Sequence, residues 1–264
     1  MSTKNLLVEL FVEELPPKAL NKLGEAFSTT LVESLKAQGL VAAAAKFEAF
    51  ASPRRLAVHV ADVAAVAADK PITLKLMPVN IALDANGEPT QALMKKLAGM
   101  GLDASIVPQL KRAPDGKAEA LFHDSVVKGV ALAEGLQKAL EQALTSLPIP
   151  KVMTYQLADG WSSVNFVRPA HKLVALHGAD IVPISVLGLQ AGRETQGHRF
   201  EAAVSPVVLE NADSYAHQLQ AQGAVIASFA ERRAEIVRQL QAAAAKAGSG
   251  LQPLQDDALL DEVT

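Results

Sequence analysis

The chain has 264 residues, of which 50% are hydrophobic and 20% are charged, so intrinsic disorder is excluded and one large domain or two ordinary ones can form. With 25 basic and 28 acidic residues, the formal net charge is -3. A uniformly basic protein that coats nucleic acid is therefore excluded, and any site for a polyanion must be a local patch. The chain has no cysteine, which excludes disulfides and thiolate metal sites.

The N-terminus does not have the shape of a secretory signal peptide, because Glu9, Glu13 and Glu14 interrupt its apolar run. Nowhere does an apolar run reach the length of about 18 residues that a membrane-spanning helix needs. These two features predict a cytoplasmic protein without a membrane segment.

Hydrophobic periodicity and turn residues predict the elements in chain order. Strands are expected at Leu6–Val12, Phe47–Ser52, Arg55–Val63, Ile72–Pro78, Ala120–Val126, Asn165–Leu176 and Ile181–Leu189. Helices are expected from Pro17 to Gln38, with Gly39 as a stop, and at Thr90–Ala98, Lys128–Ser146, Asn211–Gln222 and Ser228–Ala247. Turns are expected at Asp84–Gly87, at the hairpin Ala113–Lys117 and at Gly178–Asp180.

This order indicates an α+β fold with mostly antiparallel sheet and flanking helices, arranged in two subdomains. We expect an α+β region over residues 1–147, a β-rich region with a cationic loop over 148–210, and a helical region over 211–264. The final helix begins at Gln255-Asp256-Asp257 and shows only about two turns before the last residue. Its unmatched apolar face favours a truncated helical region, and a natural frayed tail is the alternative.

The segment LGLQAGRETQGHRF, Leu187–Phe200, combines three glycines with Arg193, His198 and Arg199. Glycine allows positive φ and a close approach to a ligand, and arginine presents a planar fork that matches phosphate oxygens. The residues alone leave two interpretations open, a phosphate-contact loop and a glycine-rich turn whose arginines form surface ion pairs.

Three other basic groups are candidates for ligand contacts. In Ser52-Pro53-Arg54-Arg55, neighbours of an extended chain point to opposite faces, so we expect only one of the two arginines to face any single ligand. Arg168, which precedes a proline in an apolar strand, is either a buried ion-pair partner or a ligand contact. Arg232, Arg233 and Arg238 share a predicted helix with Glu231 and Glu235, which favours a solvated face with internal ion pairs.

No self-contained active site is apparent in the sequence. The chain has no Walker A loop, no dinucleotide fingerprint and no nucleophile elbow. The pair His123-Asp124 lacks the further ligands that a metal site needs. We therefore expect no catalytic residue and no metal site in this chain.

Five blocks, in this order, resemble the N-terminal portion of the beta subunit of bacterial tetrameric glycyl-tRNA synthetase: NLLVELFVEELPPKAL, FASPRRLAV, FVRPAHKLVALHG, LGLQAGRETQGHRF and LLDEVT. Together they extend over nearly the whole chain, from about Asn5 to Thr264. Two positions depart from the family pattern. VMTYQLADGW stands where a Met-Arg-Trp-Gly signature is expected, and Lys172 stands where the family often has tryptophan.

The resemblance implies a heterotetrameric enzyme of two alpha and two beta subunits that joins glycine to its tRNA with ATP. It places the catalytic core, with its ATP and Mg, in the alpha subunit, and tRNA binding and assembly in the beta subunit. The implied partners are the alpha subunit and glycine tRNA, with no DNA and no membrane, and the isolated chain is expected to be inactive and to hold no cofactor. An interaction scaffold for the alpha subunit without RNA contact, or an editing-like domain, is the alternative.

With this resemblance, phosphate contact becomes the favoured role of Arg193 and Arg199, because a subunit that handles tRNA needs cations along the phosphate path. His198, Arg54, Arg55 and Arg168 complete the set of expected tRNA phosphate contacts.

Overall fold

The computed structural model describes residues 2–116, 118–248 and 250–264, and the chain forms two compact units. Unit 1 combines the residues up to Ala67 with Val130–Thr264, and unit 2 is Ala68–Gly129. This division differs from the boundaries expected near residues 147 and 210. Strand β1 (Thr3–Val12) pairs along its length with β9 (Ala170–His177), so the first and second expected regions share one sheet.

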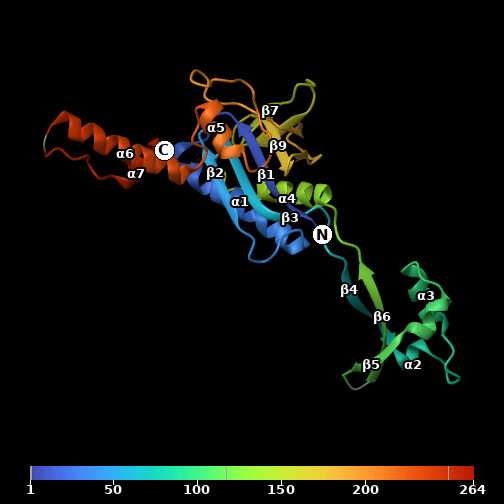
Figure 1. The fold of residues 1–264 in the computed structure, drawn as a ribbon. Helices are drawn as coiled ribbons and strands as arrows, with labels where there is room; N and C mark the ends of the chain where they lie inside the picture. Colours follow the sequence, from blue (N-terminus) through green and yellow to red (C-terminus); the bar gives the residue numbers. More distant parts are fainter. Residues whose placement is uncertain (1, 117, 249) are drawn as a thin grey trace. The chain divides into compact units, whose positions relative to one another are not determined.

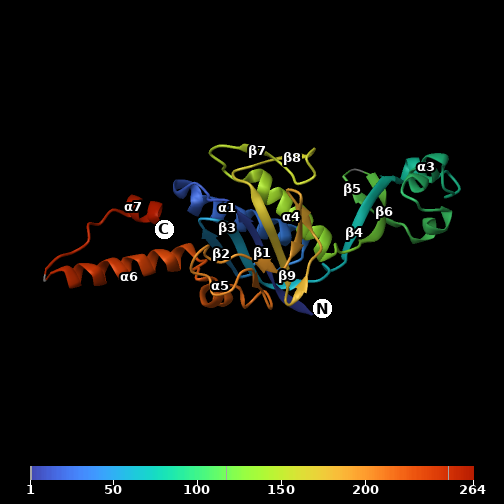
Figure 2. The ribbon, with the colours of Figure 1, turned by 90° about the horizontal axis from the view of Figure 1, so that it is seen from above.

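A seven-stranded sheet forms the centre of unit 1 (Figures 1 and 2). Its strand order is β11-β12-β9-β1-β3-β2, with β10 paired to β9. All pairs are antiparallel except that of β12 with β9. The remaining strands of this sheet are β2 (Phe47–Ser52), β3 (Arg55–Ala64), β10 (Asp180–Ile181), β11 (Ser185–Val186) and β12 (Leu189–Gly192).

Helices cover both faces of this sheet. Helices α1 (Pro17–Gln38) and α4 (Leu132–Ser146) lie on one face, and α5 (Tyr215–Gly223) lies on the other (Figure 2). Side chains alternate along β1, so Leu6, Val8 and Leu10 join the core under α1 and α4, whereas Leu7 joins the core under α5. By the same alternation Glu9 and Phe11 lie on the α5 face.

Smaller elements complete unit 1. A two-stranded sheet pairs β13 (Glu194–Thr195) with β14 (Val207–Val208), and a hairpin pairs β7 (Met153–Gln156) with β8 (Ser163–Phe166). Helix α6 (Phe229–Ala247) is capped by the Ser228 hydroxyl, and α7 (Asp257–Val263) by the Asp256 carboxylate. Arg233 of α6 forms ion pairs with Asp257 and Asp261, which hold α7 against α6.

Unit 2 has a small core of its own, formed by Leu76, Ala82, Leu93, Leu97 and Leu121. Its three-stranded antiparallel sheet has the order β4-β6-β5. The elements are β4 (Lys70–Pro78), α2 (Val79–Ala82), α3 (Gln91–Gly99), the 3-10 helix η1 (Ala104–Gln109), β5 (Lys111–Asp115) and β6 (Ala118–Val127).

The expected α+β class with mostly antiparallel sheet is confirmed. Helix α1 ends at Gln38, and Gly39 adopts the left-handed conformation that stops it, with φ 77°. The expected hairpin Ala113–Lys117 is present through Gly116, whose φ is 68°, and Lys117 lies outside the described residues.

Three expected elements differ in the structure. The expected strand Asn165–Leu176 is interrupted at Arg168-Pro169, because proline cannot donate to a ladder hydrogen bond. The segment expected as one strand, Ile181–Leu189, contributes the three short strands β10, β11 and β12. The expected helix Lys128–Ser146 begins only at Leu132, because an antiparallel bridge to Val66 holds Ala131 in an extended conformation.

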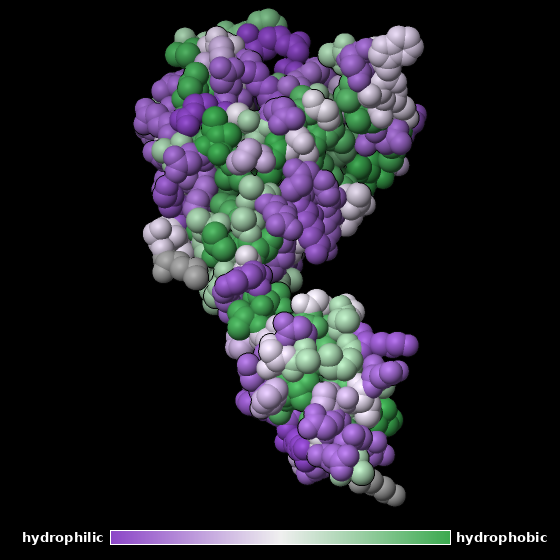
Figure 3. Space-filling view, turned by 90° about the vertical axis from the view of Figure 1, so that its right-hand side faces the viewer, coloured by the Kyte–Doolittle hydropathy of each residue, from purple (hydrophilic) through white to green (hydrophobic). Residues whose placement is uncertain are grey.

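The surface mixes polar and apolar residues. On the face shown in Figure 3, hydrophobic residues reach the surface in separate patches among hydrophilic ones. Among the described residues, no helix combines the length and apolar character needed to cross a membrane.

Candidate functional site

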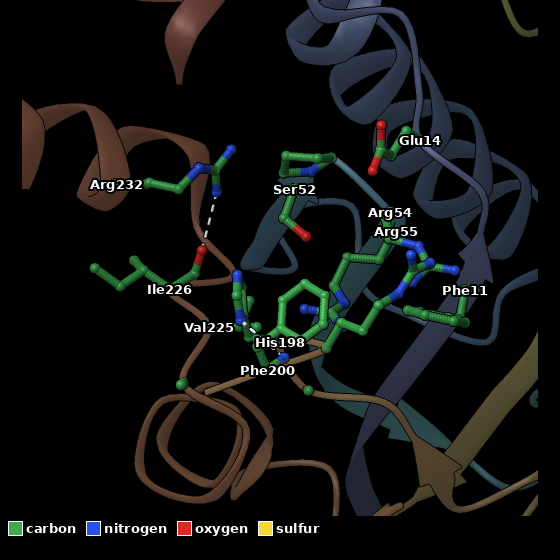
Figure 4. Close-up of a pocket in the computed structure, with 14 residues that line it drawn as sticks. Phe11, Glu14, Ser52, Arg54, Arg55, His198, Phe200, Val225, Ile226 and Arg232 are labelled. Atoms are coloured by element: carbon green, nitrogen blue, oxygen red, sulfur yellow. Dashed lines mark hydrogen bonds between the residues drawn. The ribbon is translucent and has the colours of Figure 1, made fainter. Parts of the chain in front are cut away.

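Two neighbouring depressions lie in unit 1 where β1 ends and β3 begins, and Figure 4 shows the first of them. The first, which we call the apolar lobe, has a volume of about 480 Å³ and includes Phe200, Val225 and Ile226 in its lining. The second, which we call the polar lobe, has a volume of about 410 Å³ and includes Glu13, His171 and Lys172. The two lobes share Phe11, Arg54, Gly197, His198 and Arg199.

The segment Gln196–Phe200, which we call the cationic loop, is held by a close approach of two backbones. The Gly197 backbone packs against Gly223 at the end of α5, where an added Cβ would lie 2.5 Å from Gly223 Cα. The His198 N–H donates to the Gly223 carbonyl at 2.6 Å. This close approach of the two backbones explains why a glycine occupies position 197. Of the three glycines in the segment Leu187–Phe200, only Gly188 has positive φ, at 78°.

Arg199 is exposed and lines both lobes. Within the parts of the chain that the structure describes, no carboxylate lies within ion-pair distance of Arg199. Beside it, His198 Nδ1 accepts hydrogen bonds from the Phe200 and Glu201 N–H groups at 3.3 and 3.1 Å, which fixes its ring. The exposed ring of Phe200 packs edge-on against His198, with centroids 6.2 Å apart. The loop thus presents one unpaired cation and one exposed aromatic ring to the pocket.

Arg54 borders the lobes on the opposite side. Its guanidinium lies over the Phe11 ring, 4.8 Å from the centroid, and is 3.1 Å from Glu13. Glu13 also accepts from His171 Nε2 at 2.8 Å. Burial alone would raise the pKa of Glu13, but the hydrogen bond from His171 and the charges of Arg54, His171 and Arg199 outweigh it, so the net pKa is lowered. One carboxylate is therefore surrounded by several cationic groups.

Lys172 belongs to the polar lobe but already has a carboxylate partner. Its ammonium is 2.9 Å from Glu194. The positive charge that remains uncompensated in this lobe therefore comes mainly from the arginines.

Arg55 does not face the pocket as a free cation. Its side chain is 2% exposed, and its Nε lies 3.4 Å from Glu9 Oε2 without the alignment of a hydrogen bond. Its Nη2 donates to the Gln196 carbonyl, while the buried Glu9 accepts from the hydroxyls of Thr195 and Tyr215. Burial, followed by the charge of Glu9, raises the pKa of Tyr215 well above its ordinary value. The expected phosphate contact at Arg55 is thus replaced by a buried network that holds the start of the cationic loop.

Two other expected contacts lie outside the lobes. Arg193 is half-buried and donates to the carbonyls of Ala179 and Leu209 at 2.7 and 3.4 Å. Arg168 donates from Nε to the Glu14 carbonyl at 2.9 Å. No carboxylate pairs with Arg168 in residues 2–116, 118–248 and 250–264, so the ion-pair interpretation of this residue does not apply. The structure thus brings together Arg54, His198 and Arg199, and leaves Arg168 and Arg193 apart.

Arg232 lines the apolar lobe, although the sequence favoured a solvated helix face for it. That interpretation holds for Arg233 and for Arg238, which pairs with Glu235. Arg232 instead donates to the carbonyls of Ala51 and Ile226, both at 2.9 Å. Burial, with the charge of Arg55, lowers its pKa to about 10, so it remains charged at neutral pH. Its Nε also donates to the Thr264 carbonyl. Among described residues no Asp or Glu side chain pairs with it, and it adds positive charge to the lobe.

Sequence reasoning missed Arg232 and Phe200 for different reasons. The inward direction of Arg232 depends on the path of residues 224–228, which no local pattern reveals. Phe200 carried a usable signal, since it is a large apolar residue that follows two cationic residues in a polar segment. No group of three or more histidine or acidic side chains that could hold a metal ion occurs in the described part of the chain.

Comparison with known proteins shows which family the sequence of this chain matches. Residues 6–264 match the family described as glycyl-tRNA synthetase beta subunit. The chain is 70% identical over 272 residues to the glycine–tRNA ligase beta subunit of Dechloromonas aromatica (strain RCB), covering 100% of this chain and 38% of that protein. It is 71% identical over 264 residues to the same subunit of Leptothrix cholodnii, covering 100% of this chain and 37% of that protein.

A third relative gives the same result. The beta subunit of Thiobacillus denitrificans is 66% identical over 264 residues, again with 100% of this chain and 37% of the relative covered. The chain thus spans less than two fifths of the length of these relatives. With the match of residues 6–264, these identities show that the chain belongs to the glycyl-tRNA synthetase beta subunit family.

Proposed function

We propose that this chain contributes a tRNA-contact surface to a cytoplasmic glycine–tRNA ligase, with the two lobes and the cationic loop at its centre. In this proposal the alpha subunit carries the catalytic core and uses ATP and Mg to attach glycine to tRNA. The beta chain positions the tRNA and assembles with alpha into a heterotetramer. The observation that carries the proposal is the grouping of Arg199, Arg54 and Arg232 around one depression in a chain of this family.

The electrostatics of the depression support contact with a polyanion. Neither Arg199 nor Arg232 forms an ion pair with an Asp or Glu side chain among the described residues, and Glu13 is shared between Arg54 and His171. Glu14 also lines the apolar lobe, where the arginines outnumber it. Each phosphate neutralised by such a cation releases condensed counterions, which favours binding and makes it dependent on salt. A mildly acidic chain can therefore bind tRNA through this local patch.

The test measures tRNA binding as a function of salt concentration, using the full-length beta subunit assembled with alpha. Arg199→Ala should weaken glycine-tRNA binding and lower the slope of log K against log salt by about one. The KM for tRNA in the charging reaction should rise, while the KM for glycine stays unchanged. Arg238→Ala is the matched control, because Arg238 is also exposed but is paired with Glu235 on α6. Equal affinities and slopes for wild type and Arg199→Ala would refute the assignment.

One observation favours the alternative of a protein scaffold. Trp161 is 92% exposed in the turn between β7 and β8, and Val152 and Met153 at the start of the same hairpin are also exposed. Exposed tryptophan is common at the centres of protein interfaces. If the scaffold function is correct, the beta subunit will fail to bind glycine tRNA even at low salt, and Trp161→Ala will weaken its assembly with alpha.

A further inference from the structure

The two lobes differ in chemistry in a way that matches the two parts of a nucleotide. Phe200, Val225 and Ile226 line one lobe, and Lys172, His171 and Glu13 line the other, with Arg54 and Arg199 common to both. We propose that the apolar lobe binds the base of an unpaired RNA nucleotide, and that the polar lobe binds its phosphate. This inference rests on the proposed function and adds to it the kind of RNA segment that is bound.

Phe200 is the residue on which the base would stack. Its side chain is 83% exposed, although it is a large apolar residue on a loop held by the Gly197–Gly223 contact. Its ring projects into the pocket beside His198 (Figure 4). A nucleobase covers such a ring face with little regard to sequence, because every base has a π face. Stacking would thus cover the part of the ring that the chain leaves exposed.

The dimensions and the charges of the site fit one nucleotide. A volume of about 480 Å³ lies within the range of small-molecule sites, roughly 300–1,000 Å³. Arg199 borders both lobes, so its guanidinium can reach a phosphate while the attached base lies on Phe200. Bases inside a duplex are stacked and paired and cannot enter such a pocket. The site therefore selects a single-stranded segment of the RNA.

The experiment measures the coupling between Phe200 and a base. Two short single-stranded oligoribonucleotides are compared at low salt, one intact and one in which the central nucleotide is abasic, so that the phosphates are the same. They are titrated against full-length beta, assembled with alpha, as wild type, Phe200→Ala and Phe200→Tyr. Leu254→Ala is the control for loss of an exposed large apolar side chain outside the pocket, since Leu254 is 97% exposed and lines neither lobe. Because Phe200 is exposed, its replacement should leave the fold intact, which thermal unfolding of each variant checks.

If the proposal is correct, Phe200→Ala weakens binding of the intact oligonucleotide by at least about five-fold. It leaves binding of the abasic oligonucleotide unchanged, while Phe200→Tyr and Leu254→Ala behave like wild type. Equal weakening of both oligonucleotides by Phe200→Ala, or weakening of neither, would overturn base stacking.

The effect of Arg199→Ala distinguishes failure of the proposed tRNA-contact surface from failure of the base site alone. If Arg199→Ala leaves the affinity and the salt dependence unchanged for both oligonucleotides and for tRNA, the RNA-contact surface itself is refuted. If Arg199→Ala weakens all three ligands while Phe200→Ala shows no coupling, phosphate contact stands and only the base site is refuted.

Discussion

At the scale of single residues, adjacent arginines with the same side-chain chemistry have different roles. Arg54 lies on Phe11 beside the half-exposed Glu13, whereas Arg55 is enclosed with Glu9, Thr195 and Tyr215. The alternation of side chains in an extended segment predicted that only one of them would face a ligand. Both line the apolar lobe, but which guanidinium is buried and engaged within the chain depends on Glu9 and Phe11 from β1, and so on a strand pairing between residues far apart in sequence.

The buried ion pair of Arg55 with Glu9 gives a prediction about stability. Arg55→Met leaves the Glu9 carboxylate buried without its cation, so we expect the free energy of unfolding to fall by about 3–5 kcal/mol in urea titrations. Arg54→Met, the neighbouring control, removes a half-exposed ion pair and should cost about 1 kcal/mol or less.

A double variant identifies the cause of this loss. Adding Glu9→Gln to Arg55→Met removes the buried charge and should restore part of the lost stability. A double variant no more stable than Arg55→Met would show that lost packing, rather than an unpaired charge, is responsible.

At the scale of elements, the close contact between the cationic loop and α5 decides whether the site forms. We expect Gly197→Ala to destabilise unit 1 by about 1–3 kcal/mol, because the new Cβ overlaps Gly223 and the backbone must shift. The displaced loop should also weaken tRNA binding, in the same direction as Arg199→Ala.

The control for this prediction lies in the same segment. Gly192 has no atom within 4 Å of an added Cβ, so Gly192→Ala should be neutral or stabilising by up to about 1 kcal/mol. Chemical unfolding and filter binding measure both effects. Wild-type binding by Gly197→Ala would show that the loop tolerates the shift and that its position is not set by this contact.

The elements predictable from sequence are those whose signals are local. Helix α1 was predictable because leucines recur along one face and Gly39 supplies the left-handed cap. Strands β2 and β3 were predictable from the Pro53-Arg54 turn between them. The start of α4 was not, because residues before Leu132 are held by pairing with Val66 and Ala65. Within the site, Arg199 was predictable as a surface cation, whereas the different roles of Arg54 and Arg55 and the inward turn of Arg232 depend on tertiary packing.

At the scale of the whole molecule, unit 2 is an insertion into unit 1. The segments on either side of it, which end at Ala67 and resume at Val130, are joined by an antiparallel bridge between Val66 and Ala131. The Ala67 N–H donates to the Val130 carbonyl at 2.9 Å. This arrangement escaped sequence reasoning because the chain continues through unit 2 with no change of composition that marks an insertion.

The bridge leads to a prediction about folding. Replacing Ala68–Gly129 with a short Gly/Ser turn of about four residues should leave unit 1 folded, because its two chain ends already lie at hairpin distance. Every residue of the two lobes belongs to unit 1. The beta subunit that lacks only Ala68–Gly129, assembled with alpha, should therefore bind glycine tRNA, and Arg199→Ala should weaken that binding as much as it does in the intact subunit. Urea unfolding tests whether unit 1 folds, and filter binding tests whether tRNA binding is retained. A shortened chain that folds cooperatively but loses the Arg199 effect would mean that unit 2 is needed to present tRNA to this surface.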